Sequence, residues 1–282
     1  MMSNVRKAAV AGTWYPATAP ALAAELDRHL AGTARDVFIS GDLAAIVAPH
    51  AGLMYSGPVA AHAYRLLRGR AFDVAVLVGP SHFVAFEGVS VYPSGGFATP
   101  FGVVPIDAGC ARALLEASPV VHQHAAAHTR EHSLEMQLPF LAHLGPGLPI
   151  VPLVMGRQTA ETARLLGDAL AAVLRGRKAL LVASTDLSHY HDAATAAALD
   201  ALVIDCVLRF DDEGLQDALS SQPDHACGGG PTVAVMRAAR LLGARDAVIL
   251  NYADSGDVSG DKSSVVGYLA AAFGTFSAVP SL

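Results

Sequence analysis

Residues 46–57 read Ile-Val-Ala-Pro-His-Ala-Gly-Leu-Met-Tyr-Ser-Gly, an apolar strand that stops at Pro49 and places His50 in a glycine-flanked turn. Proline ends such a strand because it cannot donate a sheet hydrogen bond. About thirty residues later the pattern repeats, and the apolar run 74–78 leads through Gly-Pro-Ser to His82. Ligands of open α/β sheets bind beyond the carboxyl ends of the strands, so the sequence predicts that these two histidines share one crevice.

The composition of the 282-residue chain narrows the classes of function. Hydrophobic residues make up 52% and charged residues 16%, which favours one compact body with a large core. The net charge of -6 provides no basic field for a polynucleotide or an anionic membrane, so we expect neither as a partner. Three cysteines are an odd and sparse set, typical of reduced thiols in the cytoplasm.

Two apolar segments near the ends of the chain do not indicate a membrane role. The apolar run at residues 8–11 is too short for the hydrophobic region of a signal peptide. Glycines, a proline and serines interrupt the uncharged C-terminal stretch, which predicts a buried strand at 264–273 and a loose tail. We therefore expect a cytoplasmic protein whose residues 1–8 and 275–282 are loosely ordered.

Helical and strand patterns alternate along the chain. The predicted helices cover residues 20–30, 57–67, 108–117, 159–174, 192–210, 213–219 and 232–242, with one or two helical turns at 134–139. The predicted strands cover residues 43–48, 73–78, 150–155, 179–184, 247–252 and 264–273, with 89–92 and 103–106 as a hairpin or as edge strands. No linker or fixed repeat interrupts the alternation. We predict a single three-layer α/β domain over residues 1–282, with a mixed, mostly parallel sheet flanked by helices.

A third strand end carries polar side chains of the same kind. The apolar run 180–183 leads into Ser-Thr-Asp186-Leu-Ser-His189, so a carboxylate and an imidazole follow the strand. Asp186 could accept the ring N–H of a histidine and fix its tautomer, as the outer partners of metal ligands do. It could equally cap the next helix, and the sequence leaves both interpretations open.

Cys227 precedes three glycines, a proline and a predicted helix. The dipole and free N–H groups of a helix N-terminus favour a thiolate, which is a metal ligand or a nucleophile. Three glycines leave little to bury the sulfur. We therefore expect Cys227 to be chemically active, in contrast to Cys110 and Cys206, which lie within predicted helices.

The stretch His128-Thr-Arg-Glu131-His132 matches the H-x-x-E-H motif of one class of zinc peptidases. That motif needs both histidines on one helical face and a distant carboxylate. Four histidines crowd residues 122–132, so a chance match is the simpler interpretation. A zinc hydrolase is kept as a third hypothesis.

Seven motifs occur in order over nearly the whole chain. They are Gly12-Thr-Trp-Tyr-Pro16, Ala48-Pro-His-Ala-Gly52, Gly79-Pro-Ser-His82, Glu131-His-Ser-Leu-Glu-Met-Gln-Leu-Pro139, Ser184-Thr-Asp-Leu-Ser-His189, Cys227-Gly228 and Tyr252-Ala-Asp-Ser-Gly-Asp257. With them the sequence resembles the Memo-like family, whose prokaryotic members are called AmmeMemoRadiSam system protein B. The resemblance implies a fold similar to that of class III extradiol dioxygenases of the protocatechuate 4,5-dioxygenase type.

The resemblance also implies the roles of individual residues. Metal ligands are implied at His50, His82 and Cys227, and these three should then lie within about 5 Å of one another. The catalytic groups implied around them are His132, Asp186 and His189. Functional association with AMMECR-type and radical SAM proteins is implied as well.

One departure from the dioxygenases affects the choice of metal. They bind Fe(II) through two histidines and a carboxylate, whereas the third position here is Cys227, whose softer thiolate suits Cu(I), Zn or a redox-tuned iron. We predict a non-haem redox enzyme with Fe(II), or else Cu or Zn, acting on a small-molecule or peptide ligand in a cleft walled by Trp14 and Tyr55. The alternatives are a non-catalytic metal- or peptide-binding accessory protein and the zinc hydrolase.

Overall fold

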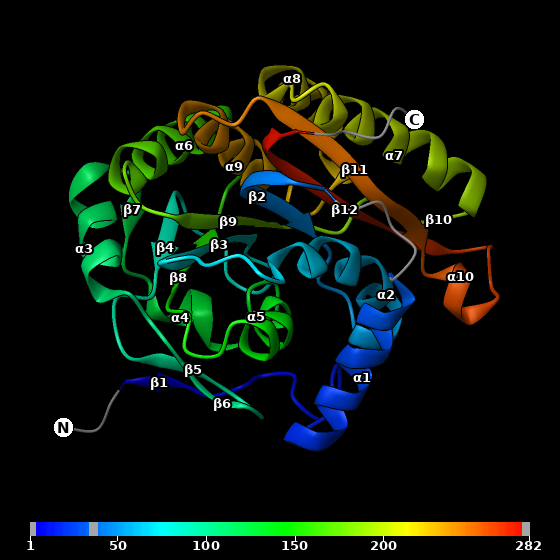
Figure 1. Ribbon diagram of the computed structural model, residues 1–282. Coiled ribbons are helices and arrows are strands. Elements are labelled where there is room, and N and C mark those ends of the chain that lie inside the picture. The colour runs from blue at the N-terminus through cyan, green and yellow to red at the C-terminus, as the bar shows by residue number, and fades with distance from the viewer. Residues whose placement is uncertain (1–3, 34–38, 278–282) are drawn as a thin grey trace.

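The computed structural model describes residues 4–33 and 39–277 of the chain. A large mixed sheet has the strand order β10-β12-β2-β9-β3-β8-β4-β7, and β11 pairs with β12 off this path. Helices cover both faces of this sheet, which gives three layers (Figure 1). The predicted α/β class, with a mixed sheet flanked by helices, is confirmed.

Parallel strands form the centre of the large sheet, and antiparallel strands lie toward its edges. The central parallel strands are β2 (Gly41–Ala48), β9 (Ala179–Ser184), β3 (Val74–Pro80) and β8 (Ile150–Met155). One side adds β12 (Val265–Phe276), β11 (Asp246–Asp254) and β10 (His189–His191), and the other adds β4 (Val89–Val91) and β7 (Val121–His122).

The central strands are buried on both faces, as parallel strands in a layered fold must be. Strand β3 is buried at all of its residues. In β2, Ala45 and Val47 belong to the core on one face of the sheet, while Ile46 and Ala48 belong to the core on the other. Burial on both faces fixes the end of β2, and therefore the position from which the next residues leave the sheet.

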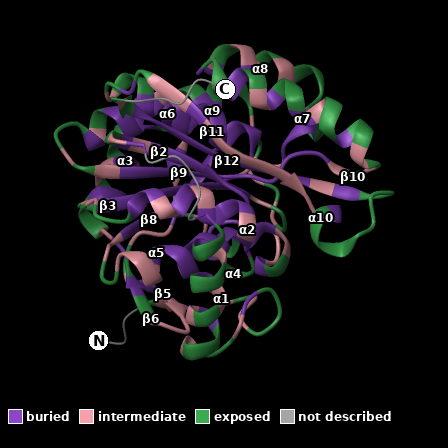
Figure 2. Cartoon of the chain, turned by 45° about the vertical axis from the view of Figure 1, so that its right-hand side comes forward, coloured by how far each residue is buried: buried purple, intermediate pink, exposed green. Residues whose placement is uncertain are grey.

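Two groups of helices enclose these cores, and buried residues concentrate in the sheet between them (Figure 2). One face carries α3 (Ala108–Ala117), α6 (Ala160–Leu174), α7 (Ala193–Leu208), α8 (Asp212–Ser221) and α9 (Gly229–Leu241). The other carries α1 (Ala19–Gly32), α2 (Leu53–Tyr64), α4 (Ala125–Thr129) and α5 (Leu138–Leu144). Short 3-10 turns occur at η1 (Arg65–Leu67), η2 (Glu135–Gln137) and η3 (Pro223–His225), and α10 (Gly256–Ser259) joins β11 to β12.

Three strands form a second, smaller sheet. They are β1 (Val5–Arg6), β5 (Gly96–Thr99) and β6 (Gly102–Pro105). Residues 89–92 and 103–106 do not form the hairpin that was one of the two predictions for them, because β4 joins the large sheet and β6 pairs with β5. The alternative prediction of edge strands is confirmed for β6, which ends the small sheet, but is wrong for β4, which lies between β8 and β7. The sequence of β5, which begins at the second residue of the pair Gly95-Gly96, did not indicate a strand.

The ends of the chain and of two helices also differ from the sequence prediction. Arg6, in the segment expected to be loosely ordered, is buried, and β12 continues to Phe276. Helix α2 begins at Leu53, so Pro58 lies inside it rather than in its first turn. Helix α9 begins at Gly229, three residues before the predicted start at 232, because two of the glycines and Pro231 form its first residues.

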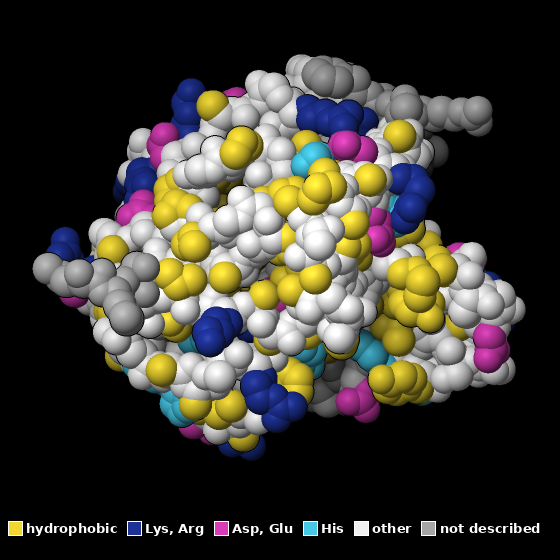
Figure 3. Space-filling view, turned by 90° about the horizontal axis from the view of Figure 1, so that it is seen from below, with side chains coloured by type: hydrophobic (Ala, Val, Ile, Leu, Met, Phe, Trp, Pro, Cys, Tyr) yellow, Lys and Arg dark blue, Asp and Glu magenta, His cyan; other side chains and the backbone are white. Residues whose placement is uncertain are grey.

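On the face seen from below, Lys and Arg side chains are scattered among hydrophobic and neutral ones (Figure 3). Among residues 4–33 and 39–277, no helix is both long and apolar enough to cross a membrane.

Candidate metal centre

The carboxyl ends of β2, β3 and β9 open into one cavity of about 630 Å³. All the residues predicted for the site line it except Tyr55. Tyr55 lies in α2 and packs instead against the core on that helix's face of the sheet. The cavity brings together side chains that lie up to 213 positions apart, from Trp14 to Cys227, and the strand-end pattern accounts for His50, His82 and Asp186 among them.

His50 is buried and its ring is held in one tautomer. Its Nδ1 lies 2.9 Å from Ser184 Oγ, and that hydroxyl donates its hydrogen to the Ser133 carbonyl at 2.6 Å. Gln137 donates to the same Ser184 oxygen at 2.7 Å. Since the hydroxyl hydrogen is already used, Nδ1 of His50 must donate, which leaves the lone pair on Nε2. Burial first, and then the nearby His82, lower the pKa of His50 well below its usual value, so the ring is neutral.

His82 is held in the same way by a carboxylate. Its Nδ1 lies 2.9 Å from Glu131 Oε1, and its backbone N–H donates to Oε2 of the same residue at 2.6 Å. Burial would raise the pKa of Glu131, but the hydrogen bonds from His82 and from the Ser133 backbone outweigh it and lower the pKa to about 2. The ionised carboxylate accepts the Nδ1 proton, and in the neutral ring this tautomer carries the lone pair on Nε2.

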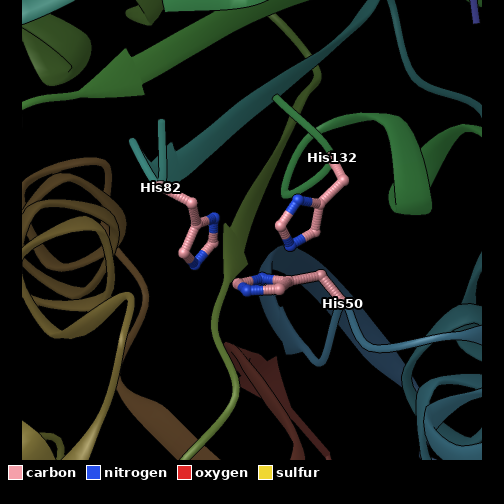
Figure 4. A group of neighbouring side chains, drawn as sticks. All are labelled: His50, His82 and His132. Carbon is pink, nitrogen blue, oxygen red and sulfur yellow. The ribbon is translucent and has the colours of Figure 1, made fainter. Parts of the chain in front are cut away.

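His132 completes a group of three imidazoles. One ring nitrogen from each of His50, His82 and His132 can be chosen so that all three lie within 4.8 Å of one another, and the rings converge from three different segments (Figure 4). The His132 ring stacks on the His82 ring, and their centroids are 4.5 Å apart. The Trp14 ring also contacts the His132 ring, with a centroid distance of 4.4 Å. Three imidazoles at this spacing could hold a metal ion.

Cys227 lies against this group, on the side of His50. Its Sγ is 3.2 Å from His50 Nε2 and accepts the backbone N–H of Asp186 at 3.3 Å. The expectation of an exposed thiolate differs from the structure, because burial and the nearby Asp186 raise the pKa of the thiol. Cys227 is partly exposed to the cavity, and Gly228 beside it allows close packing, because a Cβ at position 228 would lie 2.3 Å from the Ser184 carbonyl oxygen.

Asp186 and His189 face the cavity but do not bond to an imidazole of the group of three. Asp186 Oδ1 accepts the backbone N–H of His50 at 2.7 Å, rather than a ring N–H. The alternative role as a helix cap falls to Asp192, which caps α7. Burial raises the pKa of Asp186 to about 7, and burial lowers the pKa of His189.

Comparisons with known proteins show the family of this chain. The chain matches the family model described as Memo-like protein over residues 6–272. The chain belongs to the Memo-like family. It is 40% identical over 272 residues to a MEMO1 family protein of Methanothermobacter thermautotrophicus, covering 94% of this chain and 98% of that relative. A MEMO1 family protein of Ignicoccus hospitalis is 40% identical over 280 residues, with coverage of 95% and 98%.

A solved structure supports the fold of this Memo-like protein. An uncharacterized protein of Escherichia coli K12 superposes with a TM-score of 0.55 at 18% identity, covering 80% of this chain and 99% of that one. At that identity the likeness concerns the fold alone.

The structure places the two histidines of the H-x-x-E-H match in different surroundings. Helix α4 ends at Thr129, so His128 and His132 do not share a helical face. His128 is buried away from the cavity lining, with its Nε2 3.0 Å from Ser90 Oγ. Glu131 holds His82 instead of serving as part of a helical peptidase motif.

Sequence reasoning missed the residues that orient the histidines of this Memo-like protein. Gln137 and Ser184 were noted only as members of the family motifs, and Glu131 was noted there and in the H-x-x-E-H match, but none of the three was assigned a role at the site. A signal did exist for Gln137, since Glu135 and Gln137 are the two polar residues of the otherwise apolar stretch 134–141. Gln158 was also missed: it donates to the Cys227 carbonyl at 2.7 Å and fixes that turn.

Proposed function

We propose that this Memo-like protein is a metal-dependent redox enzyme of the extradiol-dioxygenase type, using Fe(II) or, alternatively, copper. One observation carries the proposal. His50 and His82 each have Nδ1 within hydrogen-bond distance of a fixed acceptor, and both residues line the same cavity. Histidines that bind metals are almost always oriented by such outer partners.

The donor atoms suit a first-row transition metal. Neutral imidazoles bind iron, copper and zinc, and a thiolate shifts the preference toward Cu(I) or zinc. His132 and Cys227 are the two candidates for the third ligand, and Cys227 would have to lose its proton when a metal binds. A redox-active metal in this position would supply the electron transfer that chemistry with dioxygen requires.

The surrounding side chains suit the handling of a small substrate and its protons. A cavity of about 630 Å³ is in the usual range for a pocket that holds one small molecule. His189 lines it as a neutral imidazole, because burial lowers its pKa, and one of its ring nitrogens can accept a proton from a substrate hydroxyl. Trp14 supplies an aromatic wall next to His132.

Metal content and oxygen consumption test this proposal. The full chain is purified without air or chelators, analysed for metals, and then loaded with iron and given candidate catechols. We expect oxygen consumption by the wild type, and we expect His189→Ala to retain its metal but lose that activity. Zinc without oxygen consumption would favour the hydrolase, and a protein that takes up no metal would favour the binding-protein alternative.

The third ligand is decided by two variants measured side by side. If Cys227 ligates the metal, Cys227→Ser loses loading while His132→Gln retains it with reduced activity. The reverse pattern would assign the third position to His132. Mass spectrometry of the intact, metal-loaded protein gives the metal stoichiometry for both.

A further inference from the structure

Residues 131–137 form one segment that supports several parts of the cavity. Glu131 binds His82, and Gln137 reaches His50 through Ser184. Glu135 lies between these two supports in sequence and contacts neither His50 nor His82. Its carboxylate is fully buried and points instead to the beginning of the chain.

The carboxylate of Glu135 accepts hydrogen bonds from residues along the whole of the segment 6–15. Its Oε2 accepts from the Arg6 guanidinium and from the Ala9 backbone N–H at 2.7 Å. Its Oε1 accepts from the Val10 backbone N–H at 2.9 Å and from the Tyr15 hydroxyl at 2.8 Å. A buried carboxylate satisfied by so many donors from one stretch determines where that stretch lies.

The anchored segment carries Trp14 into the cavity wall. The Trp14 backbone N–H donates to the Val10 carbonyl at 2.9 Å, and its carbonyl accepts the N–H of Leu53 at 2.8 Å. Its ring centroid lies 4.4 Å from that of His132, and 36% of the residue remains exposed. Trp14 therefore lies between His132 and solvent. It directly precedes Tyr15, whose hydroxyl donates to Glu135.

Arg6 links the same anchor to the segment that carries His132. Besides Glu135, its guanidinium donates to the carbonyl oxygens of His128 and Glu131. The ion pair is almost fully buried on both sides, so each charge depends on the other for its solvation. Movement of the N-terminal segment would therefore disturb both the aromatic wall and the loop of His132.

We propose that Glu135 is a positioning residue of the candidate metal site. By anchoring residues 6–15 it keeps Trp14 packed on His132, which excludes water from that side of the cavity and slows the exchange of a bound metal. This inference rests on the proposed function, because it takes the histidine group to be a metal site. The packing of Trp14 itself does not depend on a metal and can be measured without one.

The test uses the fact that Trp14 is the single tryptophan of the chain. Tyr15→Phe removes one hydrogen bond to Glu135 and keeps the aromatic ring, and Glu135→Gln weakens the whole anchor. Tyr252→Phe is the matched control, because the Tyr252 hydroxyl donates to the carboxylate of Asp200 at the same 2.8 Å, away from Trp14. Fluorescence emission and acrylamide quenching are recorded on the metal-free full chains, together with circular dichroism.

We expect a red shift of Trp14 emission and stronger quenching in Tyr15→Phe and Glu135→Gln, with no change in Tyr252→Phe. In iron-loaded protein, a ferrous chelator should remove the metal about tenfold faster from the two anchor variants, the scale of an outer-partner effect. If Glu135→Gln fails to fold, Tyr15→Phe decides alone. Folded variants with wild-type emission overturn the proposal, and so does an emission shift without faster metal release, since Glu135 would then act on the fold only. If the wild type holds no iron, the proposed function fails, and Trp14 emission alone decides whether Glu135 anchors the segment.

Discussion

Two histidines that lie four residues apart have different surroundings. His128 and His132 are both buried, with 1% and 9% of their surfaces exposed, and burial lowers the pKa of both to about 4. His128 packs beside Tyr92 and Phe97, whereas His132 faces the cavity with His50 and His82. Burial and pKa therefore do not distinguish a candidate metal ligand from a structural histidine. What distinguishes them is the space in front of the ring and the other donors that face it.

The largest expected difference between the cavity histidines and His128 is in metal loading. His50→Ala removes a ligand whose lone pair is held toward the cavity, so metal loading should be abolished while the fold is kept. His128→Ala is the matched control and should load as the wild type does. Metal content by mass spectrometry, with circular dichroism as a check on folding, gives the answer. Loss of metal in the His128 variant would revive the H-x-x-E-H interpretation.

The elements that place His50 and His82 could be predicted from the sequence because they repeat one local pattern. An apolar run, a proline and a histidine define a strand end, and because β2 and β3 both run parallel to β9, which lies between them, the two ends lie at the same edge of the sheet. The long helices were predicted for a similar reason: their apolar spacing extends over several turns. Strands as short as β1 and β7 have two residues each, too few for a periodic pattern.

The partners of the histidines could not be predicted, because they act through tertiary contacts. Glu131 meets His82 across 49 positions, and Ser184 meets His50 across 134. Nothing in the local sequence of either residue indicates these contacts. The proximity of His132 was assigned by resemblance, but its place in the group of three depends on the turn after α4, which the sequence pattern did not reveal.

A smaller effect concerns the pH dependence of stability. The pKa of His128 is about 4 in the folded chain, and a histidine in an unfolded chain has a pKa of about 6.5. Between these values the unfolded state binds the proton and the folded state does not, so the free energy of unfolding falls as the pH is lowered, by roughly 3 kcal/mol in total. His128→Gln lacks this contribution. Urea unfolding at several pH values from about 7 down to about 4 should show a shallower fall for the variant. Parallel curves for the two proteins would mean that His128 is already protonated, or not buried, in the folded chain.

The smallest effect comes from removing the hydrogen-bond partner of a histidine rather than the ring itself. The Glu131 carboxylate accepts hydrogen bonds from both the ring and the backbone of His82. Glu131→Gln replaces one of its oxygens with an NH2 group, so that a donor would face the His82 backbone N–H, which lies 2.6 Å from Oε2 in the wild type. We expect metal affinity to fall by about 10- to 100-fold, because an outer partner orients a ligand without bonding the metal. Ser90→Ala removes the corresponding partner of His128 and should leave the affinity unchanged. Competition titrations against a chelator of known affinity measure both. An equal loss in the two variants would contradict the distinction between the two environments, and a complete loss in Glu131→Gln would mean that the carboxylate itself binds the metal.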